Sequence, residues 1–176
     1  MVSASFFDFI HWLNGTSWSL YLRESEVAFP LTEAIHLIGL GVSVGTIMWV
    51  DLRLLGLGMR RERVADVIIR LEPWAIGGFF VMFISGLALF LGKPENYYTT
   101  LAFRIKMALI PLAGLNVLFF HKAIYPHVAE WDQRMVVPWP GRVVGVVSMT
   151  LWLAIIIAGR WTAYFADPLY TAGFKR

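Results

Sequence analysis

The sequence predicts an all-α integral membrane protein, a four-helix bundle preceded by a short N-terminal interfacial helix. Two observations lead to this prediction. The 176 residues are 58% hydrophobic and only 15% charged, with a mean hydropathy of +0.64, whereas a soluble domain is roughly 45–50% apolar and about 25% charged. The apolar residues also gather in four long segments, each close to the ~20 residues that cross a bilayer. Residues 1–176 are therefore expected to form a single transmembrane domain.

Composition also excludes several classes of function. The chain has no cysteine, which rules out disulfides, thiolate metal sites and cysteine nucleophiles. Its net charge is only +3 and the basic residues are dispersed, whereas a nucleic-acid surface gathers them on one face. We therefore expect the lipid bilayer as the main partner, and no nucleic acid.

The N-terminal segment 4–14 is predicted to be a helix lying in the membrane interface. It combines apolar side chains with Asp8 and His11, a mixture typical of interfacial helices. A secretory signal peptide would need a basic start and a continuous apolar core, and this segment has neither. The Asn14-Gly15 pair is expected to end the helix.

The four spans are predicted at about 30–56, 73–92, 100–124 and 142–165. The first, second and fourth contain stretches free of Asp, Glu, Lys and Arg, at 34–50, 74–92 and 143–159. The third is long enough only if Arg104 and Lys106 lie within the helix. Pro30 and Pro73 suit the first turn of their helices, where the missing N–H costs nothing. Pro111 falls inside the third span and is expected to kink it.

Arginine placement predicts the orientation of the bundle. We call the side that holds the N-terminus side B and the opposite side A. The first connection on side A carries five arginines, and the positive-inside rule then makes side A cytoplasmic, with both termini outside. These residues are Arg53, Arg60, Arg61, Arg63 and Arg70.

Side B holds the densest group of ionisable residues within the spans, a location that makes them candidates for function. Its members are Glu33, His36, Arg104, Lys106 and Arg160. Haem b in a helix bundle needs an axial imidazole, apolar walls and cations for its propionates. His36 is the predicted axial ligand and metal-binding residue, with the cations at the membrane edge. The second axial position is left open between His11, Lys106 and no protein ligand.

Structural roles for the same residues are kept as alternatives. Glu33 and Lys106 are also expected as a buried ion pair that fixes helix order, and His36 as a polar core residue. A second, thinner polar cluster on side A comprises Asp51, Arg53, Asn116 and His121. There His121 also suits a helix cap, and Asp51 and Arg53 an interface-anchored pair. His36 and His121 lie at opposite ends of the membrane, so they cannot share one metal ion.

Motifs along nearly the whole chain resemble an uncharacterised bacterial family of four-helix membrane proteins. They begin with Glu33-Ala34-Ile35-His36-Leu37-Ile38-Gly39-Leu40 and Asp51-Leu52-Arg53-Leu54-Leu55-Gly56, and continue with Pro73-Trp74, Ser85-Gly86, Phe103, Lys106, Asn116, His121, Trp131-Asp132, Ser148 to Trp152 and Gly159-Arg160. The resemblance implies a multi-pass protein of the bacterial inner (cytoplasmic) membrane, without an established activity.

A more distant likeness concerns the HemJ-type protoporphyrinogen oxidases, which are four-helix membrane proteins that bind haem b. By this likeness His36 matches the axial histidine, Arg53 the arginine that ends helix one, and Lys106 the lysine of helix three. The chain departs from that family in having Asp51-Leu52-Arg53 in place of a Leu-Pro-Arg motif. It also lacks the aromatic-histidine stretch that follows there.

Three functions follow as hypotheses. The first is a haem-b-binding membrane protein linked to redox or electron transfer, with His36 as axial ligand. The second is an oxidoreductase acting on a porphyrinogen or quinol. The third is a non-catalytic scaffold or small transporter-like bundle whose buried charges are structural. Expected partners are a membrane redox protein or quinone, and a second copy of the chain.

Overall fold

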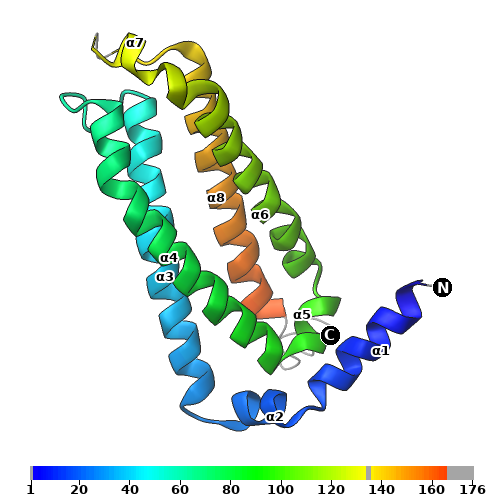
Figure 1. Ribbon diagram of the computed structural model, residues 1–176. Helices are drawn as coiled ribbons and strands as arrows, with labels where there is room; N and C mark the ends of the chain where they lie inside the picture. The colour runs from blue at the N-terminus through cyan, green and yellow to red at the C-terminus, as the bar shows by residue number, and fades with distance from the viewer. Residues whose placement is uncertain (1, 134–135, 166–176) are drawn as a thin grey trace, which may run out of the picture.

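The computed structural model describes residues 2–133 and 136–165, and this part of the chain is helical without strands (Figure 1). The elements are α1 (Val2–Asn14), α2 (Ser17–Glu24), α3 (Ala28–Leu54), α4 (Val64–Gly92), α5 (Pro94–Thr99), α6 (Leu101–Phe119), the π-turn η1 (Phe120–Ile124), the 3₁₀ turn η2 (Tyr125–His127), α7 (Val128–Asp132) and α8 (Trp139–Phe165).

Within the residues that the structure describes, four helical segments are long and apolar enough to cross a membrane, which confirms the predicted fold class. They are Ala28–Leu54, Val64–Gly92, Leu101–Asp132 and Trp139–Tyr164. In Figure 1, α1, α2 and α5 lie at one end of this bundle, which is side B, and α7 lies at the other.

The spans associate as two pairs. α3 packs along α4, α6 packs along α8, and the pairs meet through α3 and α8. In the described part of the chain, α4 and α6 do not pack along each other, and Figure 1 shows them apart over most of their length. The bundle is therefore closed on the α3–α8 side and open between α4 and α6.

Two glycines bring α3 and α4 into backbone contact. A Cβ added at Gly39 would lie 2.8 Å from the Met82 nitrogen, and one at Gly78 would lie 2.6 Å from the Ser43 nitrogen. Neither position has room for a larger residue unless the helices separate. This is how membrane helices associate, since lipid provides no hydrophobic force between them.

The start of the second span was predicted wrongly. α4 begins at Val64 rather than at residue 73, so Pro73 lies inside the helix instead of in its first turn. The cause is a distant cap: Asp132 Oδ1 accepts a hydrogen bond from the Val64 amide at 2.7 Å, and Oδ2 accepts one from Ala65 at 3.0 Å. A buried carboxylate at a helix N-terminus satisfies free amides and complements the helix dipole.

The other helix boundaries differ less from the predicted ones. α3 ends at Leu54, two residues before the predicted limit, because the chain turns at Gly56 with a φ of +72°. α6 ends at Phe119, and the predicted remainder of the third span continues as η1. Pro111 lies inside α6 as predicted.

The N-terminal helix is confirmed as α1, which ends at Asn14. Ile10 on this helix is only 1% exposed, whereas Phe9 is 50% and Trp12 63% exposed. Ile10 therefore packs this helix against the bundle, and Phe6 and Phe7 contact the Tyr98 ring of α5, while Phe9 and Trp12 remain free to enter lipid. The next helix, α2, is tied to the bundle by Ser19 Oγ, which donates to the Gly92 carbonyl at 3.2 Å.

Candidate functional site

His36 is oriented by a serine of the neighbouring span. Its Nδ1 lies 3.1 Å from Ser85 Oγ, and that hydroxyl also lies 2.6 Å from the Val81 carbonyl. A carbonyl can only accept, so the hydroxyl proton goes to Val81 and the serine oxygen accepts from Nδ1–H. This arrangement places the imidazole lone pair on Nε2, the nitrogen that a metal would use.

All four spans contribute to the layer around His36. On α4, a Cβ added at Gly86 would lie 3.0 Å from His36 Cε1, so glycine at this position makes room for the ring. From α6, the Lys106 ammonium lies close enough to act electrostatically on the imidazole. Lys106 also extends along α8, because a Cβ at Gly159 would lie 3.6 Å from its Nζ.

Tyr97 on α5 is a member of this layer that the sequence did not single out. Burial raises the pKa of Tyr97 to about 12, and the nearby Glu33 carboxylate adds to the rise. Phe103 stacks on Tyr97 and on Phe90, with ring centroids 5.7 and 5.5 Å apart. Tyr97 lies in a short connection whose position near the Glu33 carboxylate cannot be inferred from hydropathy. We name the group His36, Ser85, Lys106, Glu33 and Tyr97 the His36 layer.

The predicted arginines lie at the rim of the layer and do not touch the imidazole. Arg104 is exposed, donates from Nε to the Tyr98 carbonyl at 3.2 Å, and its guanidinium lies 5.1 Å from the Tyr98 ring centroid. Arg160 is exposed and donates to the Tyr164 hydroxyl at 2.9 Å. Both therefore sit at the side-B membrane edge on aromatic side chains.

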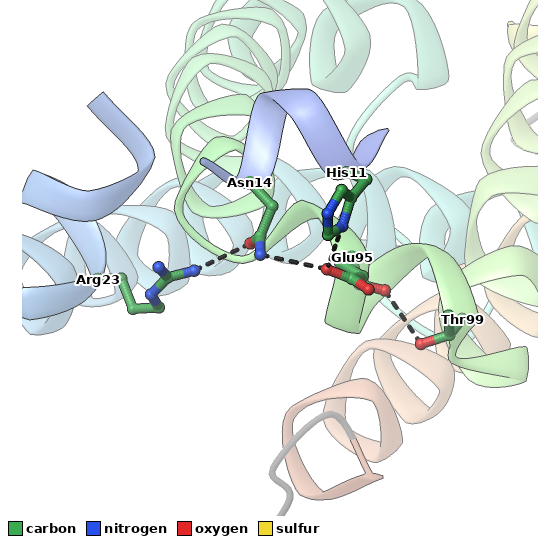
Figure 2. A network of polar contacts seen from close by, with 5 residues as sticks. All are labelled: His11, Asn14, Arg23, Glu95 and Thr99. Carbon is green, nitrogen blue, oxygen red and sulfur yellow. Dashed lines mark hydrogen bonds and ion pairs between the residues drawn. The ribbon is translucent and has the colours of Figure 1, made fainter. Parts of the chain in front are cut away.

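His11 belongs to a separate network at the surface of side B (Figure 2). Its Nδ1 lies 3.5 Å from Glu95 Oε2, and the same oxygen accepts from Asn14 Nδ2 at 3.2 Å. Arg23 in turn donates to Asn14 Oδ1 at 2.9 Å. With its side chain 72% exposed, His11 is held by Glu95 and is not brought to His36.

On side A the predicted cluster divides into separate contacts. Asp51 and Arg53 are 4% and 1% exposed, so both side chains are buried within the bundle. Asp51 accepts a hydrogen bond from Ser148, and Arg53 donates from Nε to the Glu62 carbonyl at 2.7 Å. Asn116 Nδ2 donates to the Val144 carbonyl at 3.2 Å and so ties α6 to α8.

His121 bridges the open side of the bundle. Its Nδ1 lies 3.0 Å from the Val117 carbonyl, and its Nε2 lies 3.1 Å from Glu72 Oε1 on α4. Because the carbonyl only accepts, Nδ1 carries a proton, and a second proton lies between Nε2 and Glu72. Both ring nitrogens are therefore engaged, which leaves no lone pair for a metal.

A cavity of about 640 Å³ lies inside the side-A half of the bundle. All four spans line it, mostly with apolar side chains, and its lining also includes Asp51, Ser148, Glu72 and His121. Three residues of this lining are more than nine-tenths buried and each has a polar side-chain atom without a hydrogen-bond partner in the described structure. These atoms are Ser43 Oγ, Asp51 Oδ2 and Trp152 Nε1. Of these, the sequence pointed only to Asp51.

The described residues contain no group of three or more His, Asp and Glu side chains placed to hold a metal ion. A haem needs only one or two protein ligands, so this finding does not bear on His36.

The fold and the site define a multi-pass membrane protein with four spans and two buried polar regions. Its chain belongs to a family of unknown function, DUF6644, whose model matches residues 9–165. No curated protein and no solved structure matches the chain. The predicted membership of an uncharacterised family is therefore confirmed, whereas the likeness to HemJ-type oxidases is not shown by any comparison.

Proposed function

We propose that this protein binds haem b in the membrane through His36 and takes part in electron transfer. The observation that carries the proposal is the contact between His36 Nδ1 and Ser85 Oγ at 3.1 Å. A hydrogen bond on one ring nitrogen fixes the ring and directs the other nitrogen to the metal, as at protein metal sites generally.

The residues of the His36 layer are chemically suited to hold haem b. His36 would be the axial ligand, and Ser85 holds its tautomer. Lys106 within the layer, and Arg104 and Arg160 at the rim, supply cations for propionates. Gly86 accommodates the imidazole ring itself, since a larger side chain there would meet His36 Cε1. When bound, the haem would supply one-electron chemistry.

Tyr97 would serve a haem in this layer by holding a proton. The Tyr97 hydroxyl is protonated at neutral pH, as in any tyrosine, and its raised pKa of about 12 extends this to more alkaline pH. A neutral phenol beside the Glu33 carboxylate can donate a hydrogen bond without adding charge to the membrane.

The proposed setting is the inner membrane of a bacterium, with side A in the cytoplasm and both termini outside. The arginine-rich connection after α3 supports this orientation. A quinone or a membrane redox protein would exchange electrons with the haem, and the exposed aromatic face of α1 offers contact with lipid or a second copy of the chain.

A direct test is the absorption spectrum of protein purified in detergent from haem-replete cells. A Soret band, with a pyridine haemochrome spectrum of type b, is the expected result. A colourless protein from such cells would contradict the proposal.

A structural role for the buried charges is the second candidate. The guanidinium groups of Arg104 and Arg160 each lie over the ring of a nearby tyrosine. This cation–π contact stabilises each charge without a bound ligand. If this reading is right, His36→Ala lowers the thermal stability of the protein but removes no chromophore.

A further inference from the structure

We propose that the side-A cavity binds a lipid-soluble aromatic diol of the isoprenoid quinol class. The proposal concerns a site separate from the His36 layer and does not depend on haem. It rests on the size of the cavity, on its unpartnered polar atoms and on the opening between α4 and α6.

The unpartnered atoms are the first argument. Asp51, Ser43 and Trp152 are 4%, 0% and 4% exposed, and each has an unpartnered polar atom in the described structure. Leaving a buried polar atom without a hydrogen bond is destabilising, so three such atoms lining one cavity point to a bound molecule that bonds to them. Trp152 Nε1–H requires an acceptor, whereas Ser43 Oγ and Asp51 can both be satisfied by a hydroxyl.

The spacing of these groups favours two hydroxyls over one. Asp51 accepts a hydrogen bond from Ser148, so the two residues lie at one depth. Trp152 follows Ser148 by one helical turn, which places it roughly 6 Å further along the α8 axis. A quinol carries its two hydroxyls at opposite ends of one ring and can reach both depths. An alcohol with a single hydroxyl reaches one.

The charges of the lining exclude an anionic lipid. Asp51 and Glu72 both line the cavity, and no Lys or Arg does. His121 in the lining is already bonded to Glu72 at 3.1 Å, so a fatty acid or phospholipid headgroup would meet the Asp51 carboxylate without a lysine or arginine to offset the charge. The lining is otherwise apolar and includes the rings of Phe79, Phe120 and Trp152, which suits an uncharged aromatic head.

The open side of the bundle provides room for the apolar tail. α4 and α6 are not packed along each other in the described structure, and the lipid-exposed residues Ile76 and Leu115 line the cavity from these two helices. At the side-A end, the Glu72–His121 contact of 3.1 Å joins α4 to α6. Near the side-B end, the stacked rings of Phe90 and Phe103 join the same two helices. The tail would therefore leave between these two contacts.

Two glycines allow a matched test. Gly114 lines the cavity, and a Cβ added there meets nothing within 4 Å. Gly41 on α3 is equally open but is not in the cavity lining. Gly114→Leu should fill the cavity without disturbing backbone contacts, and Gly41→Leu adds the same side chain outside it.

The experiment measures binding of a tritiated decyl benzoquinol, kept reduced without oxygen, to the full chain in nanodiscs. We expect saturable binding to the wild type, and at least about tenfold weaker binding to Gly114→Leu and to Asp51→Leu, because each removes space or a polar contact. Gly41→Leu and His36→Ala should bind as the wild type does. The His36 variant makes failure of the haem proposal distinguishable from failure of this one.

Competition experiments test whether the bound molecule needs two hydroxyls. Unlabelled quinol should displace the label, while its dimethyl ether and decanol should compete at least about tenfold less well, since each lacks one or both donors. Displacement by decanol at equal strength would overturn the assignment to a diol. Equal binding to wild type and Gly114→Leu, or no saturable binding, would overturn the site itself.

Discussion

His36 on α3 and Ser85 on α4 lie 3.1 Å apart, from imidazole Nδ1 to hydroxyl Oγ. The serine hydroxyl has a carbonyl acceptor of its own at Val81, so the pair fixes one tautomer of the imidazole. A polar core histidine would be equally satisfied by any partner on either nitrogen. A metal ligand needs one nitrogen held and the other left available, and the proposed function depends on this distinction.

Ser85→Ala should weaken haem retention. Loss of a hydrogen bond to a metal-bound histidine typically costs roughly 10–100-fold in affinity, so the ratio of haem to protein should fall during purification. Ser148→Ala, a matched serine on side A, should keep its haem. Equal haem content in the two variants would argue against the role given to Ser85.

Gly86→Val should displace the His36 ring. A Cβ at this position would lie 3.0 Å from His36 Cε1, closer than ordinary contact, and overpacking costs about 1–3 kcal/mol. We expect a lower melting temperature and loss of the Soret band. Gly77→Val adds the same side chain on α4, where a Cβ meets nothing within 4 Å, and should change neither.

Asp132→Ala should destabilise the start of α4. The carboxylate accepts from the Val64 and Ala65 amides, and removal of an N-terminal cap costs about 0.5–2 kcal/mol. A reduced melting temperature by circular dichroism is the expected result. Glu130→Ala, which removes a carboxylate that is 74% exposed, is the control. A Glu130 effect as large as that of Asp132 would contradict the cap.

The raised pKa of Tyr97 predicts how the stability of the folded protein changes at high pH. Its pKa is 10.0 in the unfolded chain and about 12 in the folded protein, so between these values the unfolded state has lost the proton and the folded state keeps it. Stability from Tyr97 is therefore full below pH 10 and is lost as pH rises toward 12. Melting temperatures measured across this range should fall less steeply for Tyr97→Phe than for the wild type. Parallel curves would show that Tyr97 is not buried as described.

Much of the fold was predictable because membrane spans depend on one property, the apolar character of ~20 consecutive residues. The errors arose where a residue far along the chain determines where a helix begins. Pro73 read as a first-turn proline because the cap that starts α4 earlier is Asp132, which comes from the end of the third span. Periodicity and hydropathy carry no information about such a contact.

The site was predictable only in part for the same reason. His36 and Lys106 were placed in one layer correctly, since equal depth follows from counting residues along two helices that enter from the same side. Rotation about each helix axis does not follow from counting. Counting therefore does not show that His11 pairs with Glu95. The sequence pointed to Asp51, Asn116 and His121 of the cavity lining, but Tyr97 and the cavity residues Ser43 and Glu72 were missed.

The most direct test of the central claim is the haem content of three purified proteins: the wild type, His36→Gly and His121→Gly. Both ring nitrogens of His121 are engaged by Val117 and Glu72, so His121→Gly should retain haem at the wild-type ratio. His36→Gly should lose it, and imidazole added during expression or reconstitution should restore a Soret band by occupying the space of the missing ring. Haem retained in full by His36→Gly, or absent from the wild type, would contradict the assignment of His36 as the axial ligand.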